Sequence, residues 1–190
     1  MISRLFLRVS AVALCLAGAA YIADTLVDLV AAGRNPGIGG FVPVLGLIGF
    51  PGFWLTLRRD HEALAVLGFV LTVLGLAGLV VVTFLMNFLF PSLMMDEVGG
   101  VVTVIGPHLA VIGVTFLLSA LVLAVVAWPT GGRVRQGAII YALGAIPLSL
   151  PPLMPAFMQD AGAVAVGAGL LIWGVTMLRG GVVAAQPEIA

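Results

Sequence analysis

The chain has 190 residues, 62% hydrophobic and 8% charged, with a formal net charge of zero and a mean hydropathy of +1.27. Soluble domains carry about 25% charged residues, so this composition excludes an ordinary soluble domain and offers no basic surface for nucleic acid. The lone cysteine, Cys15, excludes an internal disulfide and a paired-cysteine redox motif. We therefore expect an all-α, multi-pass membrane protein in which residues 1–190 form a single domain in the lipid bilayer.

Six apolar segments, each bounded by charge, Gly or Pro, predict six membrane-spanning helices. They cover residues of about 7–30, 38–57, 63–90, 99–128, 137–157 and 161–178. A hydrocarbon layer of about 30 Å needs about 20 residues of helix. The third and fourth segments exceed that length without an Asp, Glu, Lys or Arg, so they predict a membrane hairpin closed by a turn that contains Asp96 and Glu97.

The first segment also resembles a secretory signal peptide. Two arginines precede an apolar run, and Ala17-Gly-Ala19 imitates a cleavage site. However, the run continues past Ala20 to Val30, which is longer than the apolar part of a usual signal peptide. We expect an uncleaved first helix, with cleavage as the alternative.

The arginines predict the orientation of the chain, because cytoplasmic loops of membrane proteins are enriched in basic residues. All eight basic residues are arginines, and the lack of lysine is typical of a GC-rich bacterial genome. With six spans, seven arginines fall on one side, and Arg34 is the exception. These seven are Arg4, Arg8, Arg58, Arg59, Arg133, Arg135 and Arg179. We expect both termini in the cytoplasm and the protein in the plasma membrane.

Small residues and prolines predict how the helices pack. Lipid provides no hydrophobic drive for helix association, so small side chains that allow close approach matter more. Ala161, Ala165 and Gly169 share one face of the sixth segment. The fifth segment contains four prolines between residues 147 and 155, so we expect it to be kinked or partly re-entrant.

Asp24 and Asp28 are the sharpest polar signal, because they are four residues apart and share a helix face with Tyr21. If the hydrocarbon begins near Val9, Asp24 lies roughly 22 Å into a layer of ~30 Å. A carboxylate at that depth usually faces a bundle interior or a water-filled cavity. The alternative is that the span ends near Asp24 and leaves both acids in solvent.

Four other residues complete a candidate polar site on the outer side. They are Asn87, Asp96, His108 and Asp160. Methionines gather near the same side, and thioether with imidazole suits copper(I), but methionine is also a common gap-filler. No spacing typical of a metal site occurs, so we predict no metal and no cofactor.

No catalytic motif is visible, so we predict no catalytic residues. Three functions remain open at this point. The first is a non-catalytic subunit that acts through contacts with a membrane protein partner or as a homo-oligomer. The second is a small transporter or channel that uses Asp24, Asp28, Asn87 and His108. The third is a membrane-embedded enzyme.

Overall fold

The computed structural model describes residues 3–31, 37–57 and 62–180, and within these ranges the chain is helical with no strand. This confirms the predicted all-α class. The α-helices are α1 (Arg4–Ala31), α2 (Val42–Trp54), α3 (Glu62–Phe84), α4 (Met95–Ala127), α5 (Gly132–Ser149) and α6 (Ala156–Leu178). Shorter turns adjoin them: 3₁₀ turns η1 (Ile38–Phe41), η3 (Phe90–Ser92), η4 (Trp128–Thr130) and η5 (Pro151–Leu153), and the π-helical turn η2 (Leu85–Leu89).

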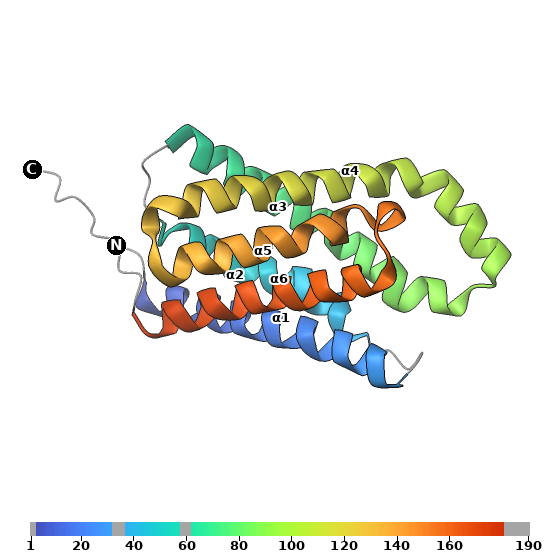
Figure 1. Cartoon of the computed structure of the whole chain (residues 1–190), viewed down its shortest axis with the longest axis horizontal. Coiled ribbons are helices and arrows are strands. Elements are labelled where there is room, and N and C mark those ends of the chain that lie inside the picture. Colours follow the sequence, from blue (N-terminus) through green and yellow to red (C-terminus); the bar gives the residue numbers. More distant parts are fainter. Residues whose placement is uncertain (1–2, 32–36, 58–61, 181–190) are drawn as a thin grey trace, which may run out of the picture.

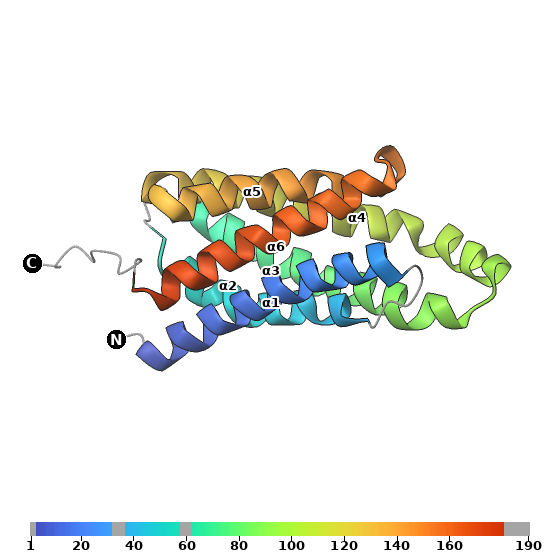
Figure 2. The same ribbon diagram turned by 60° about the horizontal axis from the view of Figure 1, so that its bottom comes forward.

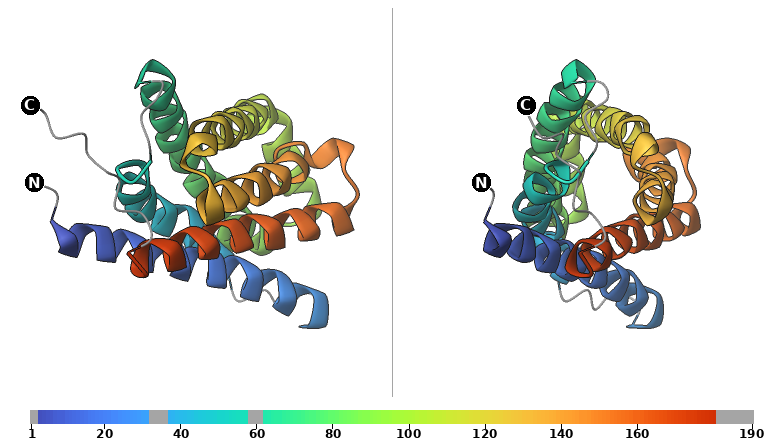
Figure 3. Two further views of the ribbon diagram at one scale, coloured as in Figure 1. Left: turned by 60° about the vertical axis from the view of Figure 1, so that its left-hand side comes forward. Right: turned by 90° about the vertical axis from the view of Figure 1, so that its left-hand side faces the viewer.

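The six helices form a closed ring in chain order. Each helix packs against its neighbours in the sequence, and α1 closes the ring against α6 (Figure 3). Successive helices run in opposite directions, so α1 begins at the same end of the bundle at which α6 finishes (Figure 1). We call this end the terminal end and the opposite one the distal end.

Four stretches are long and apolar enough to cross a membrane: Arg4–Val30, Glu62–Ser92, Met95–Thr130 and Ala156–Leu178. The stretch Ile38–Trp54 is apolar but shorter. Its two pieces, η1 and α2, meet at Val42, next to Pro43. α5 has 18 residues and carries two arginines in its first turn.

Three helices begin four or five residues earlier than the sequence predicted. α4 begins at Met95, so Asp96 lies in its first turn and not in a loop. The carboxylate of Glu97 accepts a hydrogen bond from the Met94 backbone N–H at 2.8 Å, and acids favour the positive end of a helix. Likewise α6 begins at Ala156 and takes Asp160 into its second turn. α5 begins at Gly132 and contains both arginines of the expected loop.

The expected break in the fifth segment lies at its end. α5 continues through Pro147 to Ser149 without a re-entrant turn, and the chain leaves the helix at Leu150. Pro151–Leu153 then forms a 3₁₀ turn before α6. Pro147 has no N–H, so it removes one backbone hydrogen bond from the last turn of α5, and the helix ends two residues later. The span predicted over residues 137–157 is therefore a helix of residues 132–149.

Glycines allow the close helix contacts of the ring. A side chain on Gly167 would lie 2.8 Å from the backbone oxygen of Gly18, where α6 crosses α1. Gly169 faces α5, where an added Cβ would lie 2.9 Å from the Gly137 backbone oxygen. Ala165 faces α5 too, opposite Gly144. The small-residue face predicted on this helix therefore packs against α5 from Ala165 to Gly169.

Aromatic side chains fill the middle of the ring. Phe53 stacks on Trp173 with ring centroids 4.4 Å apart, and Trp173 donates a hydrogen bond to the Val134 backbone oxygen at 3.0 Å. We call Phe50, Phe53, Phe116, Tyr141 and Trp173 the aromatic cluster; they come from α2, α4, α5 and α6 and lie in edge or tilted contact with one another. Each such pair contributes about 0.5–1.5 kcal/mol beyond burial.

Candidate functional site

Asp24 is the buried acid of α1. Its side chain is 7% exposed, and its Oδ1 has no hydrogen-bond partner among the described residues. The other oxygen, Oδ2, lies against Gly39, where a Cβ would overlap it. The alternative interpretation of the sequence, in which both Asp24 and Asp28 are exposed to solvent, is therefore wrong for Asp24. Asp28, one turn further on, is exposed.

The turn η1 separates Asp24 from the end of α3. It is entered through Gly37, which has φ of +71°, a conformation that favours glycine. Gly39 faces Asp24, whereas a Cβ on Gly40 would lie 2.9 Å from the ring of Phe88 and 3.8 Å from Cβ of Asn87. The pair Gly39-Gly40 therefore lets η1 lie between a carboxylate and an aromatic ring, and any larger residue would push them apart.

Asn87 lies in the π-helical turn η2, at the distal end of α3. Its amide donates to the Thr83 backbone oxygen at 2.8 Å, and the Thr83 hydroxyl lies 2.8 Å from the Leu79 and 3.3 Å from the Gly40 backbone oxygens. Single π turns inside helices occur frequently at functional sites. Here η2 places Asn87 across η1 from Asp24.

The remaining predicted site residues lie elsewhere. Asp96 is exposed in the first turn of α4, His108 is exposed further along that helix, and Asp160 is half-buried in α6. Within the described ranges, no three His, Cys, Asp or Glu residues come together in a way that could hold a metal ion. Of the six predicted residues, the structure thus places Asp24 and Asn87 on opposite sides of one turn and spreads the others over the distal end. Arg34, on the same predicted side, lies outside the described residues.

A cavity of about 50 Å³ lies inside the ring, bordered by η1 and by Phe50, Phe116 and Tyr141 of the aromatic cluster. Every helix contributes to its wall, together with η1. The lining residues are Tyr21, Gly39, Val42, Pro43, Gly46, Phe50, Leu76, Leu79, Thr83, Phe116, Tyr141, Val166 and Leu170. Sequence reasoning placed Tyr21 beside Asp24 but missed Gly39 and Tyr141. The Gly39-Gly40 pair at the start of a helix was the available signal for the first of these.

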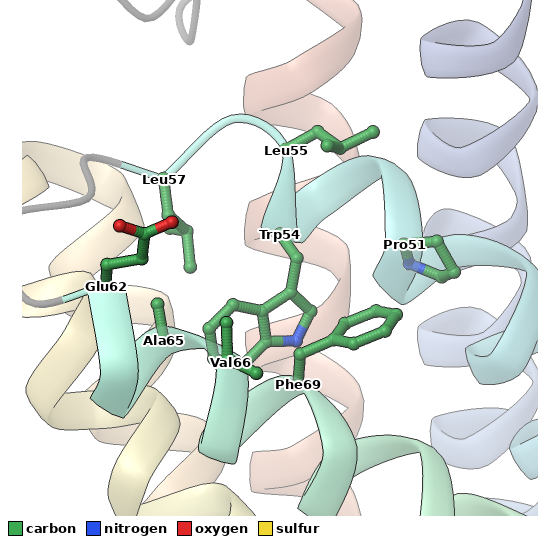
Figure 4. A pocket seen from close by; sticks show the side chains of 8 residues that line it. All are labelled: Pro51, Trp54, Leu55, Leu57, Glu62, Ala65, Val66 and Phe69. Atoms are coloured by element: carbon green, nitrogen blue, oxygen red, sulfur yellow. The ribbon is translucent and has the colours of Figure 1, made fainter.

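A second pocket, of about 260 Å³, lies between the end of α2 and the start of α3 (Figure 4). Its walls are almost entirely apolar, with the carboxylate of Glu62 at one side. The Trp54 indole forms one wall and contacts Phe69 edge to face, with ring centroids 6.2 Å apart. The indole N–H of Trp54 has no hydrogen-bond partner among the described residues. Such walls suit an apolar chain more than a polar substrate.

The end of α3 and the start of α4 project beyond the other helices at the distal end (Figures 1 and 2). We call residues 84–111 the projecting hairpin. No residue from 77 to 115 is buried. Exposed apolar side chains of the hairpin include Phe84, Met86, Phe88, Met94, Met95, Val102, Val104 and Val111.

One face of α4 in the projecting hairpin consists of small residues. Gly99, Thr103, Gly106 and Ala110 follow one another at helical spacing, and a Cβ on either glycine would meet no atom within 4 Å. Gly113, the next position on this face, does pack: its Cβ would lie 2.8 Å from the Ser149 backbone oxygen. The face that holds α5 therefore continues past the end of α5 with nothing packed on it.

No protein-family model, curated protein or solved structure matches this chain.

Proposed function

We propose that this chain is a six-span protein of a bacterial plasma membrane, with both termini in the cytoplasm. Five arginines lie in the described ranges, and all five sit where helices meet the terminal end: Arg4, Arg8, Arg133, Arg135 and Arg179. Five of the six described acids lie in the distal half of their helices or at the distal end: Asp24, Asp28, Asp96, Glu97 and Asp160. Basic residues accumulate on the cytoplasmic side, so this distribution supports a cytoplasmic terminal end.

The projecting hairpin carries the functional proposal, which is a non-catalytic role through contact with a membrane partner. α4 has 33 residues and α6 has 23, so at 1.5 Å per residue α4 is longer by about 15 Å. If α6 spans the hydrocarbon layer of about 30 Å, the projecting hairpin extends into the headgroups and beyond. Its apolar side chains then lie outside the hydrocarbon layer, and an apolar surface of this kind marks an interaction site.

The small-residue face of α4 specifies the kind of partner. A glycine inside a helix costs about 1 kcal/mol relative to alanine, and at Gly99 and Gly106 no described atom lies within 4 Å of where a Cβ would be, so no close contact within the chain requires a glycine there. Small residues that are three or four positions apart share one face of a helix and let a second helix approach closely. The partner we propose is therefore a helix of another membrane protein, laid along Gly99, Thr103, Gly106 and Ala110 where α5 has ended.

The tip of the projecting hairpin adds a charge preference. Asp96 is exposed there, and the hairpin carries no arginine or lysine. A partner helix with a basic residue at its outer end would complement this charge, which speeds association more than it raises affinity.

Purification from native membranes in mild detergent tests the proposal. The wild-type chain is expected to retain a second membrane protein, and Gly106→Leu is expected to release it, because the leucine fills the space that the partner helix occupies. Val125→Leu is the matched control, since Val125 is 56% exposed on the same helix but outside the hairpin. A partner retained equally by Gly106→Leu, or a wild-type chain that purifies alone or only with copies of itself, would contradict the proposal.

Transport of a small cation is the second candidate function. The observation that favours it is the cavity lined by all six helices, with the buried Asp24 behind its Gly39 wall. Transport predicts a flux in liposomes that Asp24→Asn abolishes while expression is unchanged. The aromatic cluster lies between the cavity and the terminal end, so this candidate also needs a second conformation.

A further inference from the structure

A groove lies between the start of α5 and the end of α6, at the terminal end of the bundle (Figure 1). Its volume is about 270 Å³, and we call it the α5–α6 groove. The lining residues are Arg133 and Gln136 of α5 and Leu171, Ile172 and Val175 of α6. Arg133 and Gln136 are exposed, whereas Val134 and Trp173, on the inward faces of the same turns, are buried. The groove therefore opens away from the ring, on the surface that faces lipid once the bundle is in a membrane.

The depth of the α5–α6 groove matches the boundary between lipid headgroups and acyl chains. α6 has 23 residues and is about 35 Å long, close to the ~30 Å of the hydrocarbon layer. Leu171 lies seven residues before the end of α6 at Leu178, so the apolar wall begins about 10 Å inside that end. Arg133 is the second residue of α5 and lies nearer the end of the bundle. The groove thus has an apolar wall below a charged rim, in the order in which a phospholipid carries its chains and headgroup.

The rim of the groove is positively charged. The guanidinium of Arg133 is charged at any physiological pH, and its N–H groups match two oxygens of a phosphate. No other described residue forms an ion pair with it. Gln136, three residues further along α5, has an amide that can donate to the same phosphate. Arg179 is exposed four residues after Val175, on the same face of α6, and the positive end of the α5 dipole lies at the same rim.

The surroundings favour an anionic headgroup over a zwitterionic one. α5 contains no acid, and the one acid of α6, Asp160, lies at the opposite end of that helix. Glu62, at the start of α3, is on a helix that is not a neighbour of α5 or α6 in the ring. Within the described ranges, no carboxylate is therefore placed to pair with the ammonium group of a zwitterionic lipid, whereas Arg133 can pair with a phosphodiester.

We propose that the α5–α6 groove binds an anionic phospholipid of the cytoplasmic leaflet, with its phosphate on Arg133 and Gln136 and one acyl chain along the apolar wall of α6. Basic pockets between membrane helices on the cytoplasmic side bind anionic headgroups. A free phosphate ion would use the rim but not the wall, so the wall favours the lipid. The inference rests on the proposed cytoplasmic position of the terminal end, and it is independent of the projecting hairpin at the distal end.

Native mass spectrometry of the full chain in detergent tests this proposal, with dioleoyl phosphatidylglycerol and dioleoyl phosphatidylethanolamine added in separate titrations. The wild type is expected to bind the phosphatidylglycerol more tightly. Arg133→Gln should weaken that binding about fivefold, the factor that one basic side chain contributes to attraction by anionic lipid. Arg135→Gln is the matched control, because it removes the same charge from the same turn, but its guanidinium lies 5.1 Å from the Trp128 ring and outside the groove. Equal affinity of the wild type for the two lipids, or an equal loss in both variants, would overturn the assignment.

The apolar wall is tested with the charge unchanged. Val175→Phe fills part of the groove and should weaken the binding of phosphatidylglycerol, with circular dichroism confirming that the helices are intact. Glycerol phosphate, which has the anion without the chains, should not displace the lipid. Displacement by glycerol phosphate, or full binding in Val175→Phe, would show a site for the anion alone and contradict the lipid. The titrations are made in detergent, so their result does not depend on which side of the membrane the terminal end faces.

Discussion

The fit of α1 against α6 can be tested with two Gly→Ala variants that differ only in their surroundings. Gly167 and Gly106 both lie inside helices, so alanine brings each the same intrinsic gain of about 1 kcal/mol. At Gly106 the added methyl group meets nothing within 4 Å. At Gly167 it would lie 2.8 Å from the Gly18 backbone oxygen and 2.8 Å from the Ile22 side chain.

The intrinsic gain cancels when the two variants are compared, which leaves the cost of overpacking at the α1–α6 crossing. Overpacking of a tight core costs about 1–3 kcal/mol, so Gly167→Ala should have a lower free energy of unfolding than Gly106→Ala by about that amount. Unfolding by SDS in mixed micelles, followed by the loss of helical circular dichroism, provides the measurement. Equal stability of the two variants, within about 0.5 kcal/mol, would refute the close crossing on which the closed ring depends.

Three further predictions concern the core, η1 and the orientation. Trp173→Phe should lower the free energy of unfolding by about 1–3 kcal/mol, because it removes a buried hydrogen bond and leaves a cavity; SDS unfolding measures it. Gly39→Ala should lose about 1–3 kcal/mol, because its Cβ overlaps a carboxylate oxygen, and combining it with Asp24→Ala should recover about 0.5–3 kcal/mol of that loss. A cysteine at Arg133 should react with an impermeant thiol reagent only from inside the cell, and one at Asp96 only from outside.

Each of these has a control. Trp128 is 56% exposed and contacts Arg135 at 5.1 Å, so Trp128→Phe should cost less than about 1 kcal/mol. Full additivity of Gly39→Ala and Asp24→Ala would remove the inferred contact between η1 and α1. The labelling requires a background without Cys15, and reaction of the Arg133 cysteine from outside would reverse the orientation.

Hydropathy predicted six helical segments, and the described residues form six α-helices, because each segment depends on a local run of residues. The order of the helices around the ring could not be predicted from hydropathy. Whether α6 packs against α1 depends on steric fit between residues far apart in sequence, such as Gly18 and Gly167, which a hydropathy pattern does not contain. The start of α4 was misplaced because Glu97 caps the helix and takes charged residues into its first turn.

The sequence indicated which residues of the candidate site are polar, but not how these residues are arranged in space. The position of Asp24 in the first helix left both burial and solvation open, and the structure buries it. His108 was included in the candidate polar site near the outer start of the span predicted over residues 99–128. In the structure α4 begins at Met95 and projects beyond its neighbours, so His108 is exposed on the hairpin. Relative helix lengths decide this, and an isolated apolar run does not reveal how far its neighbours extend.

Photo-crosslinking in living cells tests the proposed partner contact most directly. A photoreactive residue placed at Ala110, on the small-residue face of the projecting hairpin, should give one discrete crosslink to another membrane protein. The same residue at Leu143, which is 61% exposed on α5, should give only lipid adducts. Lipid adducts alone at both positions would show that the bilayer covers the projecting hairpin, and the proposed function would then be wrong.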